Sequence, residues 1–284
     1  LVASGLPSSV QVFMNQSQPF RNLAFSSPLV LDAGQNTNGL AAADLDRDGI
    51  PDLAVACGQG GPDGGLVNIF RGRGDGTFEP STVIVVPRGA YTIAVADLDR
   101  NGFPDLVVPG YTSDTLSIVL GETDGGFHVA STVTVGTQPM TVAVGDWERN
   151  GIPDLALGYN TSPFVSVFLG AGDGGVGPAN NFAVGDAGFR GMTSVDFNRD
   201  GLDDLMVAGT RITAWLPGAG DGGFLPLVKF PGTVGGVGVV GGDWNHDGRP
   251  DIAIADVATG NARSHLGDGQ GGFSTGRFQA AGGS

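Results

Sequence analysis

The chain has 284 residues, a formal net charge of −15 and an isoelectric point near 4.3. Nucleic acids and anionic membranes attract basic proteins, so this charge argues against both as partners. Hydrophobic residues make up 40% of the sequence, enough for a folded core, and no apolar stretch approaches the roughly 18 residues of a membrane helix. The single cysteine, Cys57, excludes an internal disulfide, and we expect it to be a buried strand residue.

The first 38 residues have the pattern of an incomplete repeat. Two short apolar strands, Leu1–Gly5 and Val10–Phe13, are followed by an aromatic residue, Phe20. These segments align with the second, third and fourth strands of the repeats that follow. We therefore expect residues 1–38 to form a partial blade that lacks its first, innermost strand.

Five complete repeats follow, at residues 39–89, 90–137, 138–189, 190–235 and 236–284. Each contains one nine-residue pattern: Asp, any residue, an acid or Asn, any residue, Asp or Asn, Gly, any two residues, and Asp. The patterns begin at Asp44, Asp97, Asp146, Asp196 and Asp243, so successive starts are 53, 49, 50 and 47 residues apart. Repetition at a nearly fixed period is the signature of a repeat architecture.

The repeat at 90–137 shows the expected strands most clearly. Four short apolar runs, at 90–96, 106–109, 116–120 and 127–135, are separated by turn-forming residues, and no helical period extends over ten residues. First strands such as Gly39–Ala43 are rich in small residues, as crowded innermost strands require. Four antiparallel strands per repeat predict an all-β fold, a single β-propeller domain over residues 1–284. This chain would have six blades, five complete and one partial, and a seven-bladed parent is the alternative.

A second motif recurs between the third and fourth strands of each repeat. It is an Asp-Gly turn, which supplies the positive φ that tight hairpins require. An aromatic residue follows the turn in four of the five complete repeats, and Val176 stands there in the remaining one. We expect this residue to seal one blade against the next. The four aromatic residues are Phe78, Phe127, Phe224 and Phe273.

The nine-residue patterns, named metal loops 1 to 5 (residues 44–52, 97–105, 146–154, 196–204 and 243–251), have the composition of calcium sites. Ca²⁺ takes about six to eight oxygen ligands, and each loop offers side-chain oxygens at positions 1, 3, 5 and 9 and a carbonyl at position 7. Oxygen-only ligands favour Ca²⁺ or Mg²⁺ over zinc or copper, and three or four carboxylates on a flexible loop favour Ca²⁺. The predicted ligands of about five Ca²⁺ ions are Asp44, Asp46, Asp48, Ile50 and Asp52; Asp97, Asp99, Asn101, Phe103 and Asp105; Asp146, Glu148, Asn150, Ile152 and Asp154; Asp196, Asn198, Asp200, Leu202 and Asp204; and Asp243, Asn245, Asp247, Arg249 and Asp251.

Two further observations bear on these loops. Sixteen of the 29 acids occupy the predicted ligand positions, and five bound divalent ions would reduce the net charge to −5. A helical EF-hand also opens with spaced acids and a glycine, but it needs a glutamate at position 12, where loops 1 and 2 have Val55 and Val108. We therefore interpret the loops as hairpins that join the first and second strands of each blade.

These motifs resemble the FG-GAP and VCBS repeats of the integrin α-subunit propeller and of related bacterial calcium-binding proteins, whose blades read DxNxDGxPDLxV and GxGDGxF. The resemblance covers the five complete repeats and the partial first one. It implies a calcium-stabilised, usually seven-bladed propeller outside the cell that acts in adhesion, in glycan binding or as an accessory domain. All five loops match by position, with Glu148 in place of the usual Asp or Asn in loop 3 and His246 between the ligands of loop 5.

The function predicted from these features is an extracellular or cell-surface binding, adhesion or assembly module in which Ca²⁺ holds the hairpins shut. Its partner would be a glycan or an extracellular protein. The metal loops share one face of the predicted propeller, and the loops after the second and fourth strands share the other face, which varies most between repeats. The candidates for ligand contact on that second face are Tyr91, Tyr111, Tyr159 and Arg190.

Two alternatives remain open at the level of the sequence. A carbohydrate-active enzyme of the lyase or dehydratase type would need a cluster of His, Tyr and Arg, and only scattered residues of these kinds are present. The sequence therefore favours a protein that is not an enzyme, and it indicates no catalytic residues. In the third interpretation, the incomplete blade accepts a strand from another chain and builds an oligomer or a filament.

Overall fold

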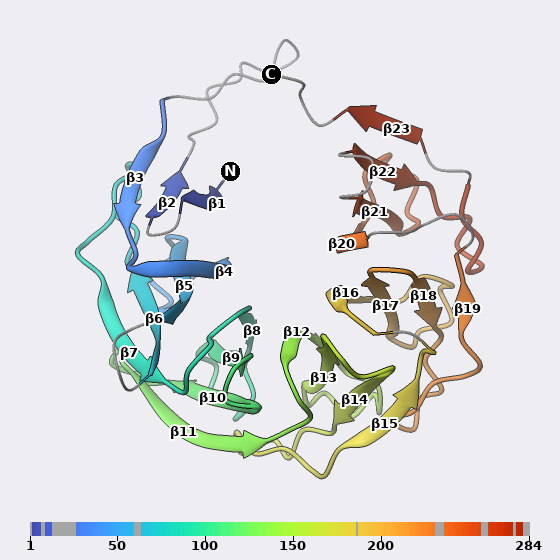
Figure 1. Cartoon of the computed structure of the whole chain (residues 1–284), viewed down its shortest axis with the longest axis horizontal. Coiled ribbons are helices and arrows are strands. Elements are labelled where there is room, and N and C mark those ends of the chain that lie inside the picture. The colour runs from blue at the N-terminus through green and yellow to red at the C-terminus, as the bar shows by residue number, and fades with distance from the viewer. Residues whose placement is uncertain are drawn as a thin grey trace. The chain divides into compact units, whose positions relative to one another are not determined.

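A computed structural model describes residues 2–6, 9–12, 27–59, 64–185, 187–230, 236–256, 261–274 and 277–280. These residues form 23 strands, arranged in five four-stranded sheets and one three-stranded sheet. All pairings are antiparallel, and the strands of each sheet follow one another in chain order (Figure 1). Among the described residues, no helix is long and apolar enough to cross a lipid bilayer. The predicted all-β fold of four-stranded propeller blades is confirmed.

The chain divides into two compact units. The first unit comprises Leu1–Asp97 and Asn101–Thr134, and the second comprises Leu98–Arg100 and Val135–Ser284. The sheets of the first unit are β1 (Val2–Leu6), β2 (Ser9–Val12) and β3 (Leu29–Asp32); β4 (Gln35–Ala43), β5 (Asp52–Gln59), β6 (Gly65–Phe70) and β7 (Thr82–Val86); and β8 (Ala94–Ala96), β9 (Asp105–Gly110), β10 (Thr115–Gly121) and β11 (Phe127–Thr134). The three-stranded sheet is the expected partial blade. Phe13 and Phe20, which we assigned to it, lie outside the described residues.

The second unit contains three complete blades. Its sheets are β12 (Pro139–Gly145), β13 (Asp154–Tyr159), β14 (Phe164–Phe168) and β15 (Asn180–Ala183); β16 (Phe189–Val195), β17 (Asp204–Gly209), β18 (Thr213–Leu216) and β19 (Val228–Lys229); and β20 (Gly236–Gly242), β21 (Asp251–Asp256), β22 (Asn261–His265) and β23 (Arg277–Ala280). β16 begins at Phe189, one residue before the boundary expected between the repeats 138–189 and 190–235.

Small residues allow the first strands of neighbouring blades to approach closely within each unit. A Cβ atom on Gly39 of β4 would lie 2.6 Å from the Cα of Thr92, and one on Gly191 of β16 would lie 2.7 Å from the Cα of Gly238 in β20. Non-bonded carbon atoms do not approach so closely, because their optimal separation is about 3.5–4.0 Å. Gly39 and Gly191 are therefore required by packing between blades.

The hydrophobic core of each unit lies between successive blades. In the second unit, Phe224 follows the Asp-Gly turn of one blade and contacts two rings of the preceding blade, with centroid distances of 5.7 Å to Trp147 and 5.1 Å to Phe182. Phe273 makes the same kind of contact with Phe197, at 5.7 Å. The prediction that the aromatic residue after the turn seals neighbouring blades is confirmed for these positions.

Cys57 is a core residue of β5, as expected. Its side chain is fully buried, and the thiol donates to the carbonyl of Ala33 at 2.7 Å. Burial raises the pKa of the Cys57 thiol to about 11. The thiol is therefore protonated at neutral pH, and its role is to pack and to donate a hydrogen bond.

Candidate metal centres in the hairpin loops

The five metal loops have one backbone conformation. Each joins the first and second strands of its sheet, so the predicted hairpins are observed. Glycine at position 6 has φ between 75° and 88° in every loop, as its predicted role in a sharp bend requires. Position 4 is also left-handed, with φ between 54° and 63°, although it carries a side chain. The spacing of acids and glycine in the sequence does not indicate this second feature. The residues at position 4 are Arg47, Arg100, Arg149, Arg199 and His246.

Backbone N–H groups orient the carboxylates of each loop. In loop 1, Gly49 donates to Asp44 Oδ2 at 2.9 Å and Ile50 donates to Asp48 Oδ1 at 2.7 Å. The corresponding bonds recur in the other four loops at 2.6–3.0 Å. Each such bond uses one oxygen of a carboxylate, or the single oxygen of the Asn101 and Asn150 amides. The loop backbone therefore orients the oxygen ligands.

The aspartate at position 9 has a further structural role in every loop. The residue is fully buried, with 0% exposure, in all five loops. In loop 3, Asp154 Oδ2 accepts from the N–H of Trp147 at 2.9 Å, and Oδ1 accepts from the N–H of Gly170 at 2.8 Å. Gly170 follows the third strand, so one carboxylate ties the loop to the far end of that strand. Equivalent bonds reach Gly72, Gly121, Gly218 and Gly267.

Desolvation affects the charge of these buried carboxylates. Burial raises the pKa of Asp154 and of Asp204 above its usual value, and the hydrogen bonds from backbone N–H groups oppose that effect. A buried carboxylate is costly unless its oxygens are paired. We predicted position 9 only as a metal ligand. A glycine recurs at the end of the third strand in each complete blade, and this recurrence could have indicated that the position-9 aspartate also accepts a structural hydrogen bond.

Loops 1 and 2 bring carboxylates together most closely. Three acids in each, Asp44, Asp46 and Asp48 in the first and Asp97, Asp99 and Asp105 in the second, have ligand atoms within 4.8 Å of one another. The Oδ1 atoms of Asp44 and Asp97 are buried and have no hydrogen-bond partner. Buried oxygens without partners are rare because desolvating them is costly, so these two fit the coordination of a cation. An all-oxygen set of this kind suits a hard divalent ion.

Loops 3, 4 and 5 have a different internal arrangement. In each, an asparagine amide donates to the carboxylate two positions away. The bonds run from Asn150 to Glu148 at 3.0 Å, from Asn198 to Asp200 at 2.8 Å and from Asn245 to Asp247 at 3.0 Å. In each of these loops the ligands at positions 3 and 5 therefore lie side by side, because the amide N–H of the asparagine interacts favourably with the negative charge of the carboxylate.

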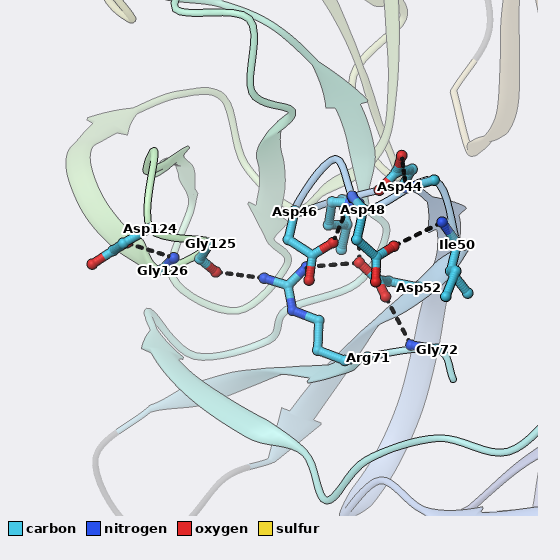
Figure 2. Close-up of polar contacts among 12 residues, drawn as sticks. Asp44, Asp46, Asp48, Ile50, Asp52, Arg71, Gly72, Asp124, Gly125 and Gly126 are labelled. Carbon is cyan, nitrogen blue, oxygen red and sulfur yellow. Dashed lines mark hydrogen bonds and ion pairs between the residues drawn. The ribbon is translucent and has the colours of Figure 1, made fainter. Parts of the chain in front are cut away.

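Arg71 is a component of loop 1 that the sequence analysis missed. Its Nη1 atom lies 2.7 Å from Asp52 Oδ2 and 3.4 Å from Asp46 Oδ2, and its Nη2 donates to the carbonyl of Gly125 at 2.5 Å (Figure 2). Arg71 follows β6 and is 19 residues from Asp52 in the sequence. Comparison of the repeats could have identified it, because the equivalent positions are uncharged in the other complete blades.

The four candidates for ligand contact differ in their exposure. Tyr91 and Tyr111 are partly exposed and lie side by side in the first unit, with ring centroids 5.6 Å apart and planes tilted by 31°. Arg190, in the second unit, is exposed. Tyr159 is only 1% exposed, and its hydroxyl contacts Ser166 Oγ at 2.8 Å. The expectation that the Tyr159 ring is available to a ligand is wrong, because β13 directs it into the core.

The three histidines contribute to different parts of the structure. His128 pairs with Glu122 at 2.5 Å on an exposed surface of β11, His246 is the position-4 residue of loop 5, and His265 is buried in β22. Among the described residues, the groups of three side chains that could hold a metal contain only aspartates. The geometry of the described residues therefore favours a cation that binds oxygen ligands.

Comparison with known families identifies FG-GAP-like repeats at residues 52–108 and 196–254, which include loops 2, 4 and 5. A stretch of 115 residues is 36% identical to integrin alpha-IIb of Mus musculus and covers 36% of this chain and 11% of that protein. Integrin alpha-V of Gallus gallus is 41% identical over 83 residues, which is 25% of this chain and 8% of that protein. The matched stretches thus cover about a tenth of the length of these relatives, and the resemblance to FG-GAP repeats is confirmed.

Solved structures extend the comparison to nearly the whole chain. An Agrocybe aegerita lectin that recognises non-reducing terminal N-acetylglucosamine has a TM-score of 0.65 at 19% identity, covering 98% of this chain and 79% of the lectin. A periplasmic gluconolactonase of Pseudomonas aeruginosa has a TM-score of 0.67 at 16% identity, covering 99% of this chain and 79% of the enzyme. At such identities the likeness shows the fold alone.

The buried aspartate at position 9 predicts a measurable loss of stability. Asp154→Ala leaves the N–H groups of Trp147 and Gly170 without acceptors, and we expect it to lower the free energy of unfolding by about 2–5 kcal/mol. Urea denaturation in excess chelator measures this effect separately from any loss of a metal ligand.

Asp173→Ala provides the matched control, because Asp173 is exposed and accepts one N–H, from Gly175. We expect that variant to lose less than about 1 kcal/mol, as is usual for an exposed surface position. Equal losses in the two variants would contradict the role of the buried carboxylate.

Proposed function

We propose that this chain of FG-GAP repeats is a calcium-stabilised β-propeller that acts outside the cell as a binding module. The observation that carries the calcium assignment is the convergence of carboxylates in loops 1 and 2 around Oδ1 atoms of Asp44 and Asp97 that no hydrogen bond satisfies. The shared backbone conformation extends the proposal to all five loops. The proposed ions are five Ca²⁺, one for each loop.

Electrostatics explains why an ion would stabilise the folded chain. Carboxylates held within 4.8 Å of one another repel in the folded state and separate in the unfolded state. A divalent cation that binds only the folded state removes this repulsion and stabilises the fold by mass action. In this proposal the loop carboxylates and the position-7 carbonyls hold the ion, and the ion's role is structural.

The proposed ligand is a glycan or an extracellular protein. Similarity to integrin alpha subunits supports a binding role, and the lectin that recognises N-acetylglucosamine shows only that this fold can present a glycan site. In this chain, the partly exposed Tyr91 and Tyr111 form a paired aromatic surface in the first unit. Aromatic rings supply large apolar contact areas to ligands. Arg190 is the proposed contact in the second unit.

A second candidate function rests on the three-stranded sheet β1–β3. It has one strand fewer than each of the other sheets formed by the described residues. A strand from another chain could complete it through main-chain hydrogen bonds and so build an oligomer. The lactonase neighbours support the fold only, and an enzymatic activity therefore gains no support from them.

The calcium proposal predicts that the melting temperature depends on the ion. Removing calcium with excess chelator should lower the melting temperature by several degrees, and restoring millimolar Ca²⁺ should reverse the loss. Differential scanning calorimetry measures both changes. A melting curve that is the same with chelator and with Ca²⁺ would contradict the calcium assignment.

The binding proposal predicts a specific role for the tyrosine pair. We expect a glycan array to show calcium-dependent binding, and Tyr111→Ala to weaken the strongest interaction by about tenfold, which corresponds to about 1.4 kcal/mol. Tyr111→Phe retains the ring and should keep most of the affinity. Binding that is unchanged in Tyr111→Ala would show that the ligand contacts another surface.

A further inference from the structure

Loop 1 contains a positive charge among its predicted calcium ligands. Arg71 is largely buried, with a side-chain exposure of 17%, and its guanidinium contacts Asp46 and Asp52. The shorter contact, 2.7 Å to Asp52 Oδ2, is a charge-assisted hydrogen bond. Figure 2 shows the guanidinium lying between these two aspartates and the carbonyl of Gly125.

The other four loops have no such cation at the equivalent position. That position directly precedes the glycine that donates to the position-9 aspartate. Its residues in the other complete blades are Leu120, Leu169, Pro217 and Leu266. In loop 1, Asp52 Oδ2 consequently accepts two bonds, one from the N–H of Leu45 at 3.0 Å and one from Arg71.

Loop 1 also differs from the others in its number of acids. It has a carboxylate at all four side-chain ligand positions, Asp44, Asp46, Asp48 and Asp52, whereas each of the other loops has an asparagine at position 3 or position 5. The additional acid and the additional cation therefore occur in the same blade. With Arg71 included, the ligand positions of loop 1 carry a net charge of −3, equal to the charge of the ligand positions in each of the other four loops.

The far side of Arg71 is fixed by the next blade of the same unit. Its Nη2 donates to the carbonyl of Gly125, and its guanidinium carbon lies 5.6 Å from the centre of the Phe127 ring. The two contacts come from the turn before β11 and from its first residue. They hold the guanidinium in place, and the charge therefore cannot move far from the loop when an ion approaches.

We propose that Arg71 is a built-in counter-cation that lowers the calcium affinity of loop 1 and keeps its hairpin closed without an ion. The inference rests on the proposed function, since it concerns the response of the same loops to calcium. A fixed positive charge in contact with two ligands repels an incoming divalent ion and competes for the oxygens of Asp46 and Asp52. The same charge compensates the carboxylates when calcium is absent.

Calcium titration of an isotope-labelled chain tests the proposal at single loops. The amide resonance of Gly49 reports on loop 1, and that of Gly201 reports on loop 4. In Arg71→Leu, which introduces the residue found in three other blades, we expect the midpoint at Gly49 to fall at least tenfold and the midpoint at Gly201 to remain within about twofold. Arg71→Gln, which is neutral and keeps a donor, should shift Gly49 in the same direction and serves if the leucine variant does not fold.

Three further variants separate a local effect from a general effect of charge. Arg73→Leu removes the same charge from a half-exposed side chain, which forms an ion pair with Glu79 (Nε to Oε1, 3.8 Å). This variant should leave the calcium midpoint at Gly49 unchanged. Arg71→Lys keeps the charge and should stay within about threefold of the parent chain. Adding Asp48→Asn to Arg71→Leu restores the charge of −3 and should return the midpoint most of the way to that of the parent.

Melting curves provide a second measurement. Arg71→Leu should have a lower melting temperature than the parent in chelator and a larger increase on addition of calcium, because four uncompensated carboxylates repel until the ion binds. Provided that Gly201 still responds to calcium, two results would overturn the inference. One is a Gly49 midpoint that is unchanged in both Arg71→Leu and Arg71→Gln, and the other is a shift of the Gly49 midpoint in Arg73→Leu equal to that in Arg71→Leu. If no loop of the parent chain responds to calcium, the inference fails together with the proposed function.

Discussion

The structure depends on one buried carboxylate that recurs in every complete blade. The aspartate at position 9 of each hairpin loop accepts an N–H from the glycine at the end of the third strand, and in loops 1, 3, 4 and 5 it also accepts an N–H from within the loop. These two bonds join three of the four strands of a blade at one end. Because the carboxylate has no exposure to water, the cost of its burial is offset only when both bonds are made.

This constraint also positions the ion ligands and connects neighbouring blades. With position 9 held, the left-handed residues at positions 4 and 6 direct the remaining acids of the loop toward one another. The loops then contact the next blade within their unit: the Arg47 guanidinium lies 5.6 Å from the Phe103 ring, and Asp203 Oδ2 accepts the N–H of Asp146 at 2.9 Å. A change in the charge of one loop therefore acts on packing between blades as well as on its own hairpin.

Periodic features were predictable from the sequence, and contacts made by single residues were not. The repeat period and the Asp-Gly turns indicated the blades, the hairpin loops and the aromatic seal at Phe224, because a propeller uses each of these once per repeat. The sequence shows where Tyr159 falls in its repeat, and that place predicts a surface position. It does not show which side chains cover the Tyr159 ring in the folded chain. Comparison of the repeats marks Arg71 as the one charged residue at its position, but its partner Gly125 is 54 residues away, so no local pattern indicates the contact.

The assignment of the hairpin loops as calcium sites can be tested at each loop. Crystals grown in calcium chloride and measured with long-wavelength X-rays test it most directly, because the anomalous signal locates each bound calcium ion. We expect five peaks, one in each metal loop, with the side chains of positions 1, 3, 5 and 9 and the carbonyl of position 7 about 2.3–2.6 Å from the ion. Loops without peaks in crystals that contain calcium at other places would contradict it.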